Sequence, residues 1–379
     1  MMGRSATVEA TSSLQRPGSL WHRVHLDPLL LLLLLLVSGG GLIVLYSGAD
    51  ASVAVVKAQA MRLGVAFVAL LVFAQLDPSV YRRWSPWLYA AGLAGLVAVL
   101  VMGVGAKGAQ RWLALPGLPR FQPSEIMKLL VPMVAAWYLS RHYLPPRFRH
   151  VVVGVGLVLV PMALIIQQPD LGTSLLVGAA GMFVVFFAGL SWRLITGFFA
   201  LLGVAAPAMW FFVMRDYQKQ RVLTLLDPQS DPLGAGWNII QSTTAIGSGG
   251  WSGKGWLQGT QSHLEFLPES HTDFIVAVLA EEFGFVGLLV LLAAYLLIIL
   301  RCLYIAVNAQ DSFSRLLAGA LTMTFFVYIV VNIGMVSGLL PIVGVPLPLI
   351  SFGGTSIVTL MSAFGVLMAI HTHRRMITA

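Results

Sequence analysis

Long apolar runs separated by short polar breaks extend over most of the chain. A membrane-spanning helix needs roughly 20 mostly apolar residues, and about ten runs approach or exceed that length. We expect spans near residues 28–48, 60–76, 84–102, 123–141, 151–167, 172–190, 194–214, 273–300, 316–340 and 354–371. The pattern predicts an all-α, polytopic integral membrane protein with about ten transmembrane helices.

The same pattern predicts how the chain is divided. Residues 1–27 are mostly polar, and the apolar run after them is longer than the core of a signal peptide and lacks a clear cleavage site. We therefore expect an N-terminal tail at 1–27, one membrane domain at 28–371 and a C-terminal tail at 372–379. A single long polar connection, residues 215–272, joins the seventh and eighth spans.

Composition agrees with a membrane protein. Hydrophobic residues make up 58% of the chain and charged residues 10%, whereas soluble domains carry about 25% charged residues. The single cysteine, Cys302, excludes an internal disulfide framework, and no zinc-type Cys/His spacing occurs. The acidic residues show no metal-specific spacing, so the sequence does not decide whether a divalent cation takes part in the function. We expect no nucleic-acid partner.

The basic residues orient the spans. With a cytoplasmic N-terminus, the short inner loops and the tails receive more than half of the 23 Lys and Arg residues. The basic residues on this inner side are all arginine. The reverse orientation would oppose the usual excess of basic residues in cytoplasmic loops. We therefore expect both termini in the cytoplasm and the long connection on the outer side.

Basic residues on the outer side need another reason. Two groups of them, at 107–128 and 215–221, predict an anionic ligand at the outer face, with ordinary loop solubility as the alternative. For Lys57 and Arg62 we prefer the loop interpretation. The candidate ligand-binding residues are Arg111, Lys128, Arg215 and Arg221.

The long connection contains a glycine cluster at 247–255. A phosphate-binding P-loop would need the pattern GxxxxGK[ST] between a strand and a helix, but Ser248 and Gly255 break that pattern, so we exclude a nucleotide site. These glycines could instead let the backbone approach a ligand or another helix. Residues 236–247 are too short to span, and either lie at the membrane interface, re-enter the membrane or form a surface loop.

Asp273 stands where the long connection becomes the eighth span. Thr272 and Asp273 are typical of a helix start, where Thr caps the helix and Asp favours its positive end. We favour a functional role over this structural one, because Glu269 and His271 crowd the same turn.

Four further ionisable residues lie inside predicted spans. Glu281 and Glu282 follow Asp273 two turns deeper, and ionisable groups at membrane depth are costly and usually functional. Glu125 and Lys128 are three residues apart and share a helix face, which favours an ion pair. That pair either fixes two helices structurally or acts as a charge gate or ligand-binding lysine.

Polar or broken backbone occurs at three places on the outer side, residues 122–128, 168–173 and 338–354. Irregular backbone at membrane depth is tolerated only when it is buried in protein or lines a cavity. The three breaks predict a shared cavity that is open to the outer leaflet.

Several stretches resemble the SEDS (shape, elongation, division and sporulation) family of peptidoglycan polymerases. They are GAQRWL at 108–113, FQPSEIMK at 121–128, QPDLGTS at 168–174, GKGWLQGTQSHLEFLPESHTDFIVAVLAEEFGFVG at 253–287 and GMVSGLLPIVGVPLPLISFGGTS at 334–356. They follow the family order over nearly the whole chain after residue 20, and residues 259–269 resemble the elongation branch more than the division branch. Ser270 departs from the family, because many relatives have a basic residue there.

The resemblance implies a ten-span glycosyltransferase that joins lipid II disaccharide-pentapeptides into glycan strands and releases undecaprenyl diphosphate. It also implies a class B penicillin-binding transpeptidase as partner, within the cell-elongation machinery that maintains rod shape. In the family the aspartate of the HTDF motif is essential, and that aspartate is Asp273 in this chain.

A mechanism follows as a hypothesis. A β-1,4 link formed from an α-linked diphosphate donor inverts the anomeric carbon, which needs a base for the incoming 4-hydroxyl and positive charge for the departing diphosphate. We expect Asp273 to be the base. The expected diphosphate ligands are Arg111, Lys128, Arg215 and Arg221, with Glu269 and His271 also near the substrate.

Two other functions compete with this one. A flippase for lipid-linked precursor would need a cytoplasmic headgroup site, but the charges concentrate on the outer side. A scaffold that only anchors a transpeptidase would not need charges at membrane depth.

Overall fold

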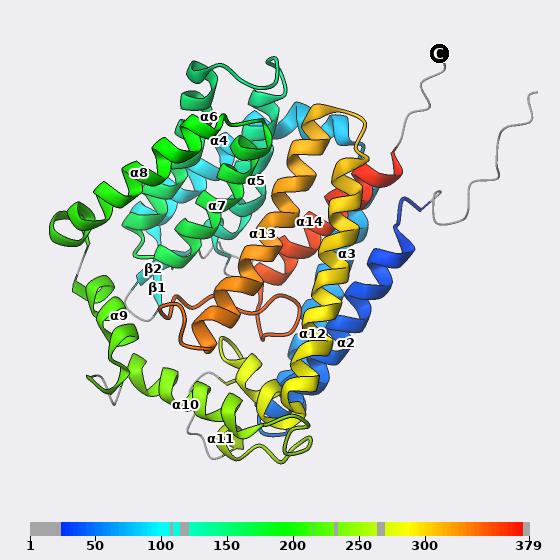
Figure 1. Ribbon diagram of the computed structural model, residues 1–379. Coiled ribbons are helices and arrows are strands. Elements are labelled where there is room, and N and C mark those ends of the chain that lie inside the picture. The colour runs from blue at the N-terminus through cyan, green and yellow to red at the C-terminus, as the bar shows by residue number, and fades with distance from the viewer. Residues whose placement is uncertain are drawn as a thin grey trace, which may run out of the picture.

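The computed structural model describes residues 24–106, 109–113, 121–214, 216–230, 234–263 and 270–373. Every predicted span overlaps one helix of a bundle (Figure 1). These helices are α2 (Pro28–Gly48), α3 (Val53–Gln75), α4 (Pro78–Met102), α5 (Pro123–Leu139), α6 (Phe148–Gln167), α7 (Leu171–Phe187), α8 (Trp192–Ala208), α12 (Ile275–Val307), α13 (Ser312–Val336) and α14 (Thr355–Thr372).

The lengths of these helices fit a polytopic membrane protein. Helices α2, α3, α4, α6, α12, α13 and α14 are long and apolar enough to cross a membrane. Helices α5, α7 and α8 are shorter, with 17 residues each. The all-α membrane fold is confirmed, and the crossing of a membrane by all of these helices stays a prediction.

Aspartates explain why two helices begin before their apolar runs. Asp77 accepts a hydrogen bond from the backbone N–H of Ser79 (2.7 Å) and starts α4 at Pro78. Asp311 accepts one from Ser314 (2.8 Å) and starts α13 at Ser312. The two helices thus begin six and four residues before the predicted spans, which start near 84 and 316, because the capped first turns are polar and resemble loops.

Short elements occupy the connections on one end of the bundle. They are β1 (Val104–Ala106), β2 (Ala109–Trp112), a π-helix at Met209–Val213, α9 (Asp216–Leu226), a 3-10 helix at Pro228–Ser230, α10 (Ala235–Ser248) and α11 (Thr260–His263). The antiparallel pair β1–β2 was not predicted. Because residues 236–247 belong to α10, the surface-loop alternative for them was wrong, and their place relative to the membrane stays a prediction.

Helix α5 lies at the centre of the bundle. It packs against α4, α6, α7 and α13, while α14 packs along α3, and α12 packs against α2 and α13. Nearly all side chains of α5 are buried, including Glu125 and Lys128. The predicted intramembrane charges therefore lie inside the protein and not on a lipid-facing surface.

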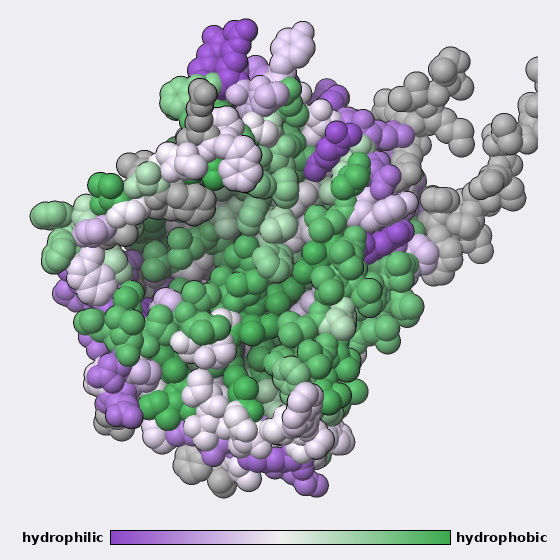
Figure 2. Space-filling view, in the orientation of Figure 1, coloured by the Kyte–Doolittle hydropathy of each residue, from purple (hydrophilic) through white to green (hydrophobic). Residues whose placement is uncertain are grey.

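The outer surface of the bundle is apolar. Figure 2 shows a broad hydrophobic area across the middle of the visible face, with hydrophilic residues gathered towards its two ends. Large apolar side chains on α2, α3 and α12 are exposed, for example Leu36, Val65 and Val290. This arrangement fits a lipid solvent around the middle of the helices.

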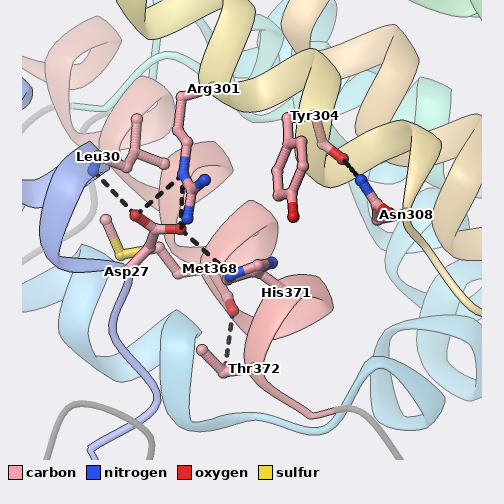
Figure 3. Close-up of polar contacts among 8 residues, drawn as sticks. All are labelled: Asp27, Leu30, Arg301, Tyr304, Asn308, Met368, His371 and Thr372. Atoms are coloured by element: carbon pink, nitrogen blue, oxygen red, sulfur yellow. Dashed lines mark hydrogen bonds and ion pairs between the residues drawn. The ribbon is translucent and has the colours of Figure 1, made fainter.

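A buried ion pair joins three helix ends on the side of the bundle opposite Asp273. The Asp27 carboxylate accepts hydrogen bonds from Arg301 Nε (3.0 Å) and Nη2 (2.6 Å) and from the backbone N–H of Leu30 (3.0 Å). His371 Nε2 lies 3.5 Å from the same carboxylate (Figure 3). Asp27 thereby connects the start of α2 with the ends of α12 and α14.

Candidate active site

The eighth span begins slightly later than predicted. Residues 270–274 form turns, and α12 starts at Ile275 with Phe274 in the N-cap position and no side-chain cap. The structural alternative, in which Thr272 caps the helix and Asp273 favours its positive end, is therefore wrong. Asp273 lies in the irregular segment that leads into the helix.

Two distant segments hold the backbone around Asp273. Asn332 of α13 donates one hydrogen bond from Nδ2 to the carbonyl of Asp273 (2.9 Å) and another to the carbonyl of Val345 (2.7 Å). The backbone N–H of Phe352 donates to the carbonyl of His271 (2.9 Å). The predicted irregular segment 338–354 therefore lies directly beside the HTDF motif.

Contacts of the neighbouring residues complete this support. The Ser270 hydroxyl donates to the carbonyl of Gly48 at the end of α2 (2.9 Å), so the residue that departs from the family pattern has a structural partner. Gly344 adopts a left-handed conformation with φ of 73°, and a Cβ atom there would lie 3.4 Å from Asp273 Oδ2. The carboxylate of Asp273 thus lies against the backbone of the 338–354 segment.

Arg111 joins two of the three predicted polar breaks. It donates to the carbonyl of Pro169, and its Nη1 lies 3.9 Å from Asp170 Oδ2. Gln122 Nε2 donates to the same Asp170 oxygen (2.9 Å), and Asp170 Oδ1 caps α7 at the N–H of Thr173 (3.2 Å). The strand β2, the start of α5 and the start of α7 therefore meet at Asp170.

Glu125 and Lys128 form the predicted ion pair, with 2.6 Å between Lys128 Nζ and Glu125 Oε1. Lys128 also donates to the hydroxyl of Tyr328 on α13. Tyr328 precedes Asn332 by four residues, so the two side chains share one helix face and lie about 6 Å apart along the axis. Lys128 is thus bonded to α13 one turn away from the residue that holds Asp273.

Glu281 has structural partners. Its Oε1 accepts hydrogen bonds from Lys254 Nζ (2.7 Å) and from the backbone N–H groups of Thr260 (2.8 Å) and Gln261 (3.0 Å) at the start of α11. The carboxylate therefore fastens the long connection, residues 215–272, to α12. Glu282 accepts a hydrogen bond from the hydroxyl of Ser47 at the end of α2.

The glycine cluster packs against a break in α12. Gly284 has φ of 66° and ψ of −163°, and the N–H groups of Phe285 and Val286 donate to the carbonyls of Gly250 (2.9 Å) and Trp251 (3.1 Å). A Cβ atom on Gly284 would lie 2.3 Å from the nitrogen of Gly253. Of the alternatives for these glycines, close approach to another helix is the one that the structure shows.

A groove of about 940 Å³ lies between α3, the start of α5 and the start of α14. Its lining includes Arg62, Trp112, Gln122, Phe352 and Thr355. Two of the three predicted breaks, 122–128 and 338–354, supply lining residues. The third break, 168–173, does not line the groove but contacts one of its lining residues, because Gln122 donates a hydrogen bond to Asp170. The groove is thus shared by two of the three breaks and not by all three, and its opening to the outer leaflet stays a prediction.

Sequence reasoning missed two residues of this region. Arg62 belongs to α3 and lines the groove, so its interpretation as a loop residue was wrong. Asn332 is fully buried, and the signal for it was an amide side chain within a long apolar span. Its partners are distant in sequence, so the sequence did not reveal them.

The structure does not bring the remaining predicted residues to this region. Arg221 belongs to α9, which packs mainly against the 3-10 helix and α10. Arg215 and Glu269 lie outside the described residues. Within the described part of the chain no three His, Cys, Asp or Glu side chains gather into a metal-binding group, so we assign no cation site.

Known proteins resemble this chain over nearly its whole length. "Peptidoglycan glycosyltransferase MrdB" of Escherichia coli K12 is 52% identical over 360 residues, which cover 95% of this chain and 97% of the relative. "Probable peptidoglycan glycosyltransferase FtsW" of Trichlorobacter lovleyi is 37% identical over 316 residues, 81% of this chain and 80% of that protein.

Solved structures agree with these relatives. A chain from a peptidoglycan synthase complex, solved to describe how polymerization and crosslinking are coordinated, matches with a TM-score of 0.80 and 31% identity, and covers 91% of this chain and 98% of its own. The rod shape determining protein RodA of Thermus thermophilus matches with a TM-score of 0.68 and 28% identity, covering 90% and 95%. The model of the FtsW/RodA/SpoVE family of cell cycle proteins matches residues 25–376, and this chain belongs to that family, which is the SEDS family that the sequence motifs indicated.

Proposed function

We propose that this chain, a peptidoglycan glycosyltransferase of its family, polymerises lipid II into glycan strands during cell elongation, with Asp273 as the general base. The observation that carries this proposal is the support around Asp273, whose backbone is bonded to Asn332 and whose carboxylate lies against Gly344. A base must be held in a defined position to accept a proton in the transition state.

The proposed reaction is a single displacement at the anomeric carbon of the donor sugar. Asp273 accepts the proton of the acceptor 4-hydroxyl as the new bond from that oxygen to the anomeric carbon forms. The bond from the anomeric carbon to the diphosphate oxygen breaks, and its electron pair leaves with undecaprenyl diphosphate. Positive charge near the departing diphosphate lowers the barrier.

We further propose that outer-face cations supply this charge. Arg111 is half-exposed and could bind a diphosphate through two N–H groups while its contact with Asp170 keeps it in place. Lys128 is buried with Glu125 and Tyr328, so its contribution is a fixed positive charge behind the site. Roles for Arg215, Arg221, Glu269 and His271 as substrate contacts stay proposals.

The proposed location is the bacterial inner membrane, with both tails in the cytoplasm and the active site facing the periplasm. Helix α12 carries Asp273 just before its first residue and Arg301 near its end. The 27 residues from Ile275 to Arg301 correspond to roughly 40 Å of helix, which is enough to cross a bilayer. The arginine-rich loops favour the Arg301 end for the cytoplasm.

We propose a class B penicillin-binding transpeptidase of the elongation machinery as the partner. The support is the similarity to a chain from a complex in which polymerization and crosslinking are coordinated. Flippase and scaffold functions remain the alternatives. A flippase would move lipid II across vesicle membranes without making polymer, and a scaffold would do neither.

A direct test uses the purified chain with its transpeptidase partner, lipid II as substrate and glycan polymer as the readout. Asp273→Asn should lower polymer formation roughly a hundredfold or more, the usual contribution of a general base. Asp227→Asn is the control, because Asp227 is exposed and its carboxylate accepts a hydrogen bond from the N–H of Gln229 beside the 3-10 helix. Full polymer yield from Asp273→Asn would disprove the base assignment.

A further inference from the structure

A second groove, of about 730 Å³, lies between α6, α7 and α8. Helix α8 is at the edge of the bundle (Figure 1), and within the described residues it packs closely only against the π-helix that follows it. The described residues that line the groove are all apolar, and Val152, Leu159 and Phe186 among them are exposed. At membrane depth such a groove is filled by hydrocarbon and not by water.

One end of this groove lies beside the connection between α5 and α6, residues 140–147. Phe148, the first residue of α6, and Leu190, in the turn before α8, both line the groove. A Cβ atom on Gly189, next to Leu190, would lie 3.1 Å from the Cβ atom of Pro145. The connection between α5 and α6 therefore packs on the turn between α7 and α8 at the mouth of the groove.

The mouth of the groove is basic. Arg141, Arg147 and Arg149 are exposed there, and the last two stand on either side of Phe148 in the chain. Residues 126–169 and 171–215 contain no Asp or Glu, so α6, α7 and α8 supply no acid to neutralise these arginines.

Other arginines at this end of the bundle do have acidic neighbours. Arg82 and Arg301 lie within 4 Å of Asp311 and Asp27. The arginines at the mouth of the groove thus carry positive charge that an external anion can balance.

Exposed aromatic residues accompany these arginines. Tyr143 is 98% exposed, and Trp192, the first residue of α8, is 80% exposed. Tyr and Trp are enriched where membrane proteins meet the lipid headgroups. Basic residues beside them on the cytoplasmic side attract anionic lipids, because the inner leaflet is negatively charged. An acidic protein would match the same charges but would leave the apolar groove without an occupant.

We propose that this groove binds an anionic phospholipid of the cytoplasmic leaflet, with the phosphate group at Arg147 and Arg149 and an acyl chain between α6, α7 and α8. The positive charge of the mouth is complementary to the headgroup, and the apolar lining is complementary to the hydrocarbon. Helix α6 has 20 residues, which corresponds to roughly 30 Å between this mouth and the segment that carries Asp170. The lipid site is therefore separate from the candidate active site and does not depend on the proposed catalytic function.

The test measures binding of phosphatidylglycerol and of phosphatidylcholine with the same acyl chains to the purified full chain in detergent, by native mass spectrometry. Phosphatidylglycerol should bind about tenfold more tightly than phosphatidylcholine. The double variant Arg147→Gln with Arg149→Gln should remove that difference, because phosphatidylcholine has no net charge to lose. The matched control is Arg82→Gln with Arg83→Gln, which removes two exposed charges from α4 away from the groove and should keep the difference.

A second variant tests the hydrocarbon part of the site. Gly156 lines the groove, and a Cβ atom there would meet no atom within 4 Å. Gly156→Phe therefore fills the groove without a clash in the fold, and should weaken the binding of both lipids about tenfold. Gly40→Phe is the control, because Gly40 on α2 is exposed, has the same free space and does not line the groove.

Several outcomes would overturn the proposal. They are equal affinity of the unchanged chain for the two lipids, phosphatidylglycerol binding that neither groove variant weakens, and equal losses in the groove variants and their controls. An unchanged preference in the double arginine variant would leave these arginines to an acidic protein. Tighter binding of undecaprenyl phosphate than of phosphatidylglycerol would assign the groove to a polyprenyl lipid instead.

Discussion

The side-chain amide of Asn332 donates a hydrogen bond to the backbone carbonyl of Asp273, 2.9 Å away. The same nitrogen donates to the carbonyl of Val345 at 2.7 Å. One buried side chain thereby joins α13, the segment before α12 and the irregular segment before α14. Asn332 is a positioning residue, because it acts on the backbone of the proposed base and not on substrate.

This relationship predicts a selective loss of turnover. Asn332→Asp keeps the shape of the side chain but removes the N–H donor, and we expect kcat for lipid II polymerisation to fall at least about tenfold with KM little changed. Asn332→Gln should recover part of kcat, because it restores the donor. Asn308→Asp is the control, since Asn308 donates to the carbonyl of Tyr304 at an exposed helix end.

Two other outcomes would contradict this role of Asn332. If Asn332→Asp raised KM and left kcat unchanged, Asn332 would affect substrate binding and not the position of Asp273. If the variant had full activity, the two hydrogen bonds would be dispensable for the geometry of the site.

The buried pair Glu125–Lys128 makes a second prediction. Glu125→Gln leaves the Lys128 ammonium buried without its carboxylate, which should destabilise the fold by about 3–5 kcal/mol. The double variant Glu125→Gln with Lys128→Met removes both charges and should recover most of the melting temperature in detergent. We expect its polymer formation to stay below a tenth of the original, roughly the loss of one electrostatic contact of 1.4 kcal/mol or more.

That double variant distinguishes the two roles of the pair. Lys128 is bonded to Tyr328, one helical turn from Asn332, so its charge lies near the proposed base. Recovery of stability together with full polymer formation would show that the pair only fixes α5 against α13.

The sequence predicted the spans well because long apolar runs depend on the solvent and not on tertiary partners. It also predicted the Glu125–Lys128 pair, which follows from helical spacing. The role of Asp273, which follows from a motif, stays a prediction. The sequence could not predict that Glu281 fastens the long connection to α12, because the partners Lys254 and Thr260 are 27 and 21 residues away from Glu281.

Arg62 was misjudged for a related reason. Polar residues near the start of a run resemble a loop, and the sequence did not show that α3 begins at Val53. The ring that stacks on Arg62 comes from Phe352, at the other end of the chain. The packing of α14 along α3 creates that contact, and the local pattern of apolar and polar residues around Arg62 does not predict it.

The pair Asp27–Arg301 predicts a stability effect without an effect on catalysis. Asp27→Asn removes the charge that Arg301 and His371 contact, and should lower the free energy of unfolding by about 2 kcal/mol. Polymer formation well below the melting temperature should be unchanged, because Asp27 lies at the opposite end of α12 from Asp273. Thermal unfolding in detergent and a polymerisation assay measure the two effects.

The control for this variant is a surface pair. Arg82 lies 3.8 Å from Asp311, and both side chains are about half-exposed. Arg82→Gln should therefore change stability by less than about 1 kcal/mol. Equal effects of Asp27→Asn and Arg82→Gln on the melting temperature would contradict a special role for the buried pair.

The contact of the glycine cluster with α12 predicts opposite effects for two glycine substitutions. Gly284→Ala places a Cβ atom 2.3 Å from the nitrogen of Gly253 and forces an unfavourable φ of 66°, which should cost about 1–3 kcal/mol and release the segment at 249–255. Gly247→Ala meets no atom within 4 Å and lies in α10, so it should stabilise the helix by up to about 1 kcal/mol.

Limited trypsin digestion at Lys254 reports the difference, because Lys254 is bonded to Glu281 only while the segment stays packed. Faster cleavage is expected for Gly284→Ala and slower or equal cleavage for Gly247→Ala, and equal rates in both variants would show that the segment does not depend on the break in α12.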